Sequence, residues 1–105
     1  MEHSLVIKYY AIFEFESDGI NVYFPDVPEA FTCAYSVREA ILMAKEVLEL
    51  TLHKKKVREL PRPTDVEVIK IKKNELLKLI TITMYEREGV LYGNNIVEYD
   101  WLNLH

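Results

Sequence analysis

Hydrophobic and polar residues alternate along residues 8–17, and this period of two predicts a β-strand. Gly19 follows in a Ser-Asp-Gly sequence and can adopt the positive φ angle that a tight hairpin turn requires. Residues 20–24 alternate again and predict the returning strand. Successive side chains of a strand point to opposite faces, so each strand has one face for the core. We expect that face to carry Tyr9, Ala11, Phe13 and Phe15 from the first strand and Ile20, Val22 and Phe24 from the second.

A third strand is predicted at residues 30–35, after a loop that two prolines remove from the hydrogen-bonded ladder. Its small residues suit the face beneath a helix, which leaves larger side chains on the opposite face of the sheet. An apolar second face on so short a chain is normally covered, often by another copy. The predicted self-association residues on this face are Tyr10, Ile12, Phe31 and Tyr35.

A helix is predicted from Ser36 to about His53, because Ser36 and Glu39 form a capping box and apolar residues then recur with helical spacing. An extended connector with two prolines follows. Residues 66–72 read as a covering segment whose pairing the pattern leaves open, and residues 76–85 alternate as a further strand. The predicted fold class is α+β, with a three-stranded antiparallel sheet, one main helix and a fourth strand in the order β-β-β-α-β.

The predicted domain spans residues 1–86, and residues 87–105 form an irregular C-terminal tail. Glycine and asparagine interrupt this tail, and Trp101 and Leu102 near its end favour burial. We expect that pair to dock on its own domain or on a second subunit, so both residues join the predicted self-association set.

Composition and charge narrow the class of function. Half of the 105 residues are hydrophobic, which is typical of one globular domain. The single Cys33 reads as a small apolar filler and fits a reducing cytoplasm, and we expect neither a secretion leader nor a membrane span. Residues 1–50 carry a charge balance of −6, against +5 for residues 51–73. An acidic body with one basic belt favours a basic partner over nucleic acid.

No constellation in the sequence predicts catalysis. His3, His53 and His105 lack Cys, His or carboxylate neighbours at ligand spacing, and no phosphate-binding loop or nucleophile elbow is present. Glu14 and Asp26 would be the residues to test in a degenerate nuclease, but the pattern does not bring a carboxylate trio together. We therefore expect a protein that is not an enzyme and needs neither metal nor cofactor.

Recognition remains, and two segments are candidates. The first is the loop between the two prolines with its flanks, because a stiff loop loses little entropy on binding; a purely structural role as a strand terminator is weighed equally. Its predicted partner-binding residues are Tyr23, Phe24, Pro25, Asp26, Val27 and Glu29. The second candidate is a basic belt that follows the predicted helix. Its positive charges mainly suit the negative end of the helix dipole, and a nucleic-acid contact is the alternative interpretation. Its residues are Lys54, Lys55, Lys56, Arg58 and Arg62.

The ordered set YYAIFE, GINVYFPDVPEA, SVREAILMAKEVLELTL, LPRPT and LLKLITITMYE resembles the HicB family of bacterial antitoxins over about residues 7–86. The resemblance implies a partial ribonuclease H-like fold and a cytoplasmic antitoxin that self-associates. It also implies a partner, a small basic HicA-type toxin that cleaves messenger RNA. Many HicB proteins continue into a DNA-binding segment. Residues 96–103 resemble its first part faintly and the helices that would read a groove are missing, so we expect no DNA binding from this chain.

Overall fold

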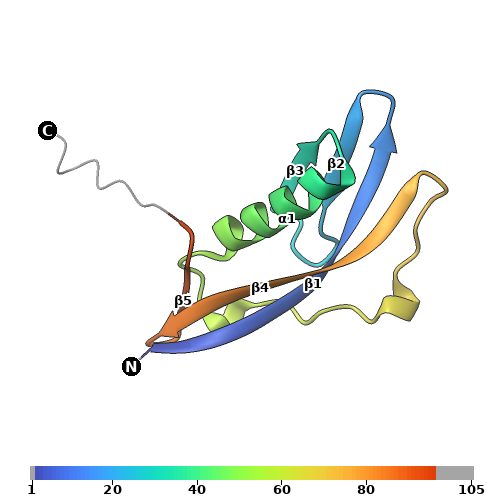
Figure 1. Ribbon diagram of the computed structural model, residues 1–105. Helices are drawn as coiled ribbons and strands as arrows, with labels where there is room; N and C mark the ends of the chain where they lie inside the picture. The colour runs from blue at the N-terminus through green and yellow to red at the C-terminus, as the bar shows by residue number, and fades with distance from the viewer. Residues whose placement is uncertain (1, 97–105) are drawn as a thin grey trace, which may run out of the picture.

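A computed structural model describes residues 2–96 and shows a single curled antiparallel sheet with one helix on one face (Figure 1). The strands are β1 (Glu2–Glu16), β2 (Gly19–Tyr23), β3 (Phe31–Ala34), β4 (Glu75–Arg87) and β5 (Val90–Gly93), in the spatial order β3-β2-β1-β4-β5. The helix α1 (Val37–Leu52) lies between β3 and the connector in sequence. Two short 3₁₀ turns, η1 (Val57–Glu59) and η2 (Val66–Val68), interrupt that connector.

Two long strands form the spine of the sheet. β4 pairs with β1 along its whole length, from Arg87 opposite Glu2 to Glu75 opposite Glu14. The shorter strands attach at opposite ends of this ribbon, because β2 pairs only with Ile12–Glu16 of β1 and β5 pairs only with Met84–Arg87 of β4. In the part of the chain that the structure describes, one half of each long strand therefore has a neighbouring strand on one side only.

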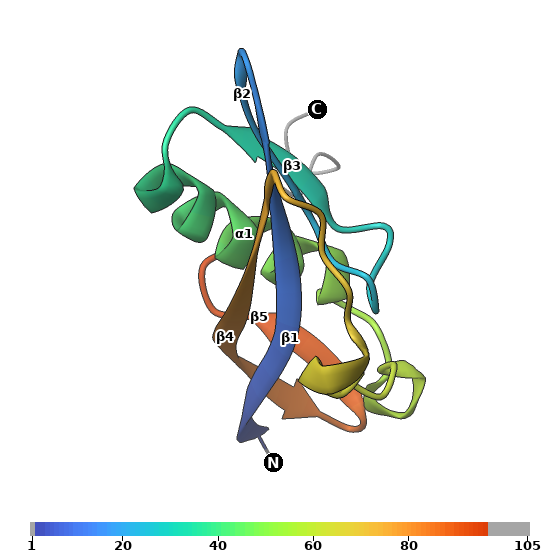
Figure 2. The same cartoon turned by 90° about the vertical axis from the view of Figure 1, so that its right-hand side faces the viewer.

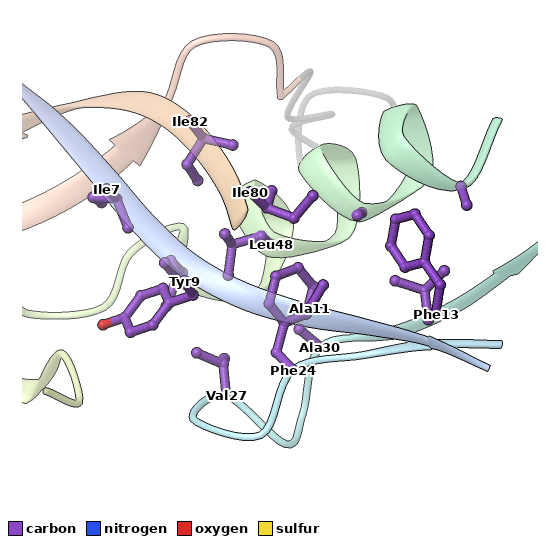
Figure 3. Close-up of a cluster of buried hydrophobic side chains, with 14 of the residues drawn as sticks. Ile7, Tyr9, Ala11, Phe13, Phe24, Val27, Ala30, Leu48, Ile80 and Ile82 are labelled. Atoms are coloured by element: carbon purple, nitrogen blue, oxygen red, sulfur yellow. The ribbon is translucent and has the colours of Figure 1, made fainter. Parts of the chain in front are cut away.

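The core lies between the sheet and α1, as the alternation predicted, except that Phe15 near the end of β1 is 38 % exposed and lies outside the core. Side chains from β1 and β2 meet those of the helix, with Phe13 and Leu48 fully buried (Figure 3). Val22 of β2 is fully buried as well. The capping box also forms: the Glu39 N–H donates to Ser36 Oγ at 3.1 Å, and Glu39 Oε1 accepts from the Tyr35 N–H at 2.7 Å. Small residues of β3 lie beneath the helix, where Ala34 is buried, whereas Phe31 points away from it.

Three details differ from the sequence-based expectation. The three-stranded sheet with a fourth strand is in fact part of one five-stranded sheet, because the Gly89 turn returns the chain as β5 inside the segment predicted as an irregular tail. Cys33 is exposed on edge strand β3 and is not a buried filler. The segment at residues 66–72 contains η2 and no strand.

Candidate partner-binding surface

Figure 1 shows α1 on one face of the sheet, and the other face carries a row of apolar side chains. Ile12 lies opposite Leu77 on one side and opposite Tyr23 on the other, and Tyr23 lies opposite Phe31. Directly paired residues project to the same face, so these four side chains cross four strands in one line. Ile12 is buried, Tyr23 and Leu77 are half-buried, and Phe31 is 57 % exposed. We call this surface the helix-free face.

The row borders a pair of carboxylates at the hairpin end of the sheet. Glu14 and Glu75 lie opposite each other on β1 and β4. The Tyr23 hydroxyl donates to Glu75 Oε2 at 2.7 Å, and Asn21 Nδ2 donates to Glu14 Oε1 at 3.2 Å. Burial, then the bond to Glu75 and the negative charges of Glu75 and Glu14, raise the pKa of Tyr23 to about 12. The bond from the Lys72 N–H and that from Tyr23 lower the pKa of Glu75, so it stays ionised.

The proline loop is anchored into the protein. The side chains of Phe24 and Val27 are 1 % and 2 % exposed and belong to the core (Figure 3). Asp26 accepts two hydrogen bonds from Thr64, from its N–H at 2.8 Å and from its hydroxyl at 2.5 Å. The loop thus ties the β2–β3 connection to the connector that follows the helix.

Further contacts fix the same corner of the molecule. The Tyr9 hydroxyl donates to the Pro61 carbonyl at 2.6 Å; burial, and then the negative charge of Asp26, raise the pKa of Tyr9. Of the residues predicted for partner binding, Pro25, Glu29 and part of Tyr23 present surface, whereas Phe24 and Val27 have packing roles. A contact between this loop and a partner stays a prediction for the exposed members.

The basic belt lies beside β5. Lys54 and Lys55 exchange backbone hydrogen bonds with Leu91, and Lys56 forms an isolated bridge with Val90, so the belt extends the sheet edge after the helix ends. Lys55 Nζ lies 3.4 Å from Glu29 Oε2, and the pKa of Glu29 is lowered by its own backbone N–H and then by Lys55. Lys54, Lys56, Arg58 and Arg62 are exposed.

The residues predicted for self-association are divided by the structure. Ile12, Tyr10 and Phe31 share the helix-free face, and Tyr35 stands 86 % exposed beyond the end of β3. Trp101 and Leu102 lie outside the described residues. The sequence interpretation missed Leu77, Leu79 and the Glu14–Glu75 pair on this surface, since only the register of β4 against β1 brings them beside Tyr10 and Ile12.

Neither a metal cluster nor a membrane-spanning helix occurs within residues 2–96. No group of three or more His, Cys, Asp or Glu side chains there is arranged to hold a metal ion. No helix in that range is long and apolar enough to cross a membrane.

Comparison with known proteins supports the fold. The sequence matches no protein-family model and no curated protein. Its structure is similar to a chain of a toxin–antitoxin complex from Streptococcus pneumoniae, with a TM-score of 0.62 and 16 % sequence identity over 95 % of this chain and 86 % of that chain. At this identity the similarity concerns the fold. The chain therefore has an α+β fold that also occurs in a toxin–antitoxin complex.

Proposed function

We propose that this protein is a HicB-like antitoxin of a bacterial toxin–antitoxin pair, and that it silences a small basic HicA-type ribonuclease by covering it. The observation that carries the proposal is the similarity of almost the whole fold to a chain of a toxin–antitoxin complex. The ordered sequence segments that resemble HicB antitoxins point the same way. In this proposal the chain is a cytoplasmic binding protein, without catalysis or cofactor of its own.

The surface proposed to meet the toxin is the helix-free face with its carboxylate pair. Phe31 and half-buried Tyr23 offer aromatic area of the kind enriched in protein interfaces. Glu14 and Glu75 beside them add negative charge, which would attract a basic partner and align it. The acidic balance of residues 1–50 acts over a longer range in the same sense.

The test is co-expression with the product of the neighbouring small basic reading frame, followed by purification through a tag on one partner. We expect a stable complex and suppression of ribonuclease activity when this chain is added. A protein that neither binds that product nor suppresses its cleavage of RNA would overturn the proposal.

The basic belt supplies the matched control. Changing Lys54 and Lys56 to glutamate should leave toxin suppression intact if the helix-free face is the binding surface. If the same change abolishes a salt-dependent RNA or DNA affinity of the isolated chain, the alternative of a nucleic-acid-binding module is supported instead.

A further inference from the structure

The N-terminal half of β4 forms an open edge of the sheet. β5 covers β4 only from Met84 onward, so among residues 2–96 no further strand borders Glu75–Thr83 on that side. Figure 1 shows this part of β4 reaching well beyond β5 toward the hairpin end. An uncovered edge of this length is a template for pairing with another strand.

One contact shows which backbone groups face this edge. Asn94, just after β5, donates through Nδ2 to the Thr83 carbonyl at 2.7 Å, so Thr83 turns its backbone groups toward the β5 side. In an antiparallel strand the N–H and C=O of a residue point the same way and alternate along the chain. The groups of Leu77, Leu79 and Thr81 therefore face outward too. None of residues 2–96 makes a backbone hydrogen bond to them across that edge.

The other sheet edges are protected, which sets this one apart. β3 is only four residues long, and the outer side of β5 is paired with the lysine segment through Leu91. The open half of β1 carries Lys8, a charged residue of the kind that discourages strand pairing, and the connector runs on that side of the sheet (Figure 2). Leu77, Leu79 and Thr81 carry no charge, and Leu79 is 48 % exposed.

A groove runs beside the open edge of β4. It has a volume of about 600 Å³ and lies between α1 and β4, lined by Leu42, Lys45, Glu46 and Glu49 of the helix and by Thr81 and Thr83 of the strand. Its wall carries one positive and two negative side chains. In a strand that pairs with this edge, Lys78 projects to the helix side where the groove lies, whereas Leu77 and Leu79 project to the helix-free face.

We propose that the open edge of β4 pairs with the same edge of a second copy, antiparallel and centred on Leu79. Leu79 then lies opposite Leu79 of the second copy and Leu77 opposite its Thr81, and the three outward N–H groups of each chain gain carbonyl partners. Lys78 of the second copy lies opposite Ile80, on the side of the sheet where Glu46 lines the groove. The contact is self-complementary and closes as a dimer, as two-fold symmetry requires.

The first test measures the mass of the purified chain by analytical ultracentrifugation. We expect the wild type at twice its 12.4 kDa and Leu79→Pro at 12.4 kDa, because proline removes an outward N–H without breaking the ladder to β1. Val6→Pro is the matched control, since Val6 is 63 % exposed on the open half of β1, and it should stay dimeric. Circular dichroism verifies that each variant is folded.

A second test keeps the proposal falsifiable should the proline variants unfold. In a Cys33→Ser background, Leu79→Cys should form a disulfide-linked dimer on mild oxidation, because Cα atoms of a hydrogen-bonded pair lie about 5.5 Å apart. Val6→Cys should not. A monomeric wild type, or a dimer that Val6→Pro disrupts and Leu79→Pro does not, overturns the proposal. Leu79 also lies on the helix-free face proposed to meet the toxin, so loss of toxin capture by Leu79→Pro without a dimer of the wild type overturns the pairing of two copies as well.

Discussion

The proline loop and the helix-free face differ in how their aromatic residues are used. Phe24 in the loop is 1 % exposed, whereas Phe31, seven positions later, is 57 % exposed on the sheet. Phe24 belongs to the segment predicted for partner binding and directly precedes Pro25, whereas Phe31 belongs to the set predicted for self-association. The proline loop therefore stabilises the core through its buried side chains, and the neighbouring strand β3 supplies the side chain that is accessible to a partner.

We expect the largest loss of folding stability when Phe24, the aromatic residue of the loop, is truncated. Phe24→Ala removes a fully buried side chain and leaves a cavity against the helix, so unfolding free energy should fall by about 3–5 kcal/mol. This is a large part of the stability of an ordinary domain. Urea denaturation checks the value. Phe31→Ala is the control and should cost less than about 1 kcal/mol; equal losses would erase the distinction between the two regions.

Asp26 should give the next largest effect, again within the loop. Asp26→Ala leaves the Thr64 N–H and hydroxyl without their acceptor, and the expected cost is about 1–3 kcal/mol in chemical denaturation. Glu29→Ala, in the same loop, removes an exposed carboxylate that pairs with Lys55 and should leave the stability nearly unchanged, because exposed ion pairs contribute little. A larger loss at Glu29 than at Asp26 would contradict a clamping role for Asp26.

Most elements of the fold could be predicted from the sequence, but the contacts of Phe24 and Asp26 could not. Alternation and the capping box are local signals, and they placed the first hairpin, the helix and the last long strand, although β1 begins at Glu2 and not at the predicted residue 8. Burial of Phe24 depends on the helix packing over it, and the role of Asp26 depends on Thr64, which lies 38 positions away. Such contacts have no local signature.

The candidate surface was predictable only in part, for a related reason. Phe31 and Tyr10 were assigned to the correct face because strand periodicity fixes side-chain direction. Glu75, Leu77 and Leu79 were missed because only the register of β4 against β1 brings them to that face. β5 was missed because Gly93 and the two asparagines after it masked a four-residue strand.

Substitution of Phe31 should affect partner binding more than substitution of Phe24 does, which is the reverse of their effects on folding stability. Phe31→Ala should weaken toxin binding by about tenfold or more, as loss of an aromatic interface residue does, while barely changing stability. Leu42→Ala on α1 is the control, because Leu42 is similarly exposed at 59 % but on the opposite face of the sheet. Calorimetric titration of each variant with an inactive toxin measures the affinities. Weaker binding by Leu42→Ala than by Phe31→Ala would move the interface to the helix.

The smallest effect concerns ionisation of Tyr23 at the border of the helix-free face. Its folded pKa of about 12 exceeds the ordinary value of 10.0 because the phenol is partly buried, donates to Glu75 and faces two negative charges. The contribution to stability is thus complete below about pH 10 and is lost as pH rises toward 12, since the unfolded chain releases the proton first. Titration of tyrosinate absorbance, with Tyr23→Phe to assign the signal, should show that Glu75→Gln lowers this pKa and that Glu14→Gln lowers it less. An unchanged pKa in Glu75→Gln would mean that burial alone sets it, and the carboxylate would then be free to turn toward a basic partner.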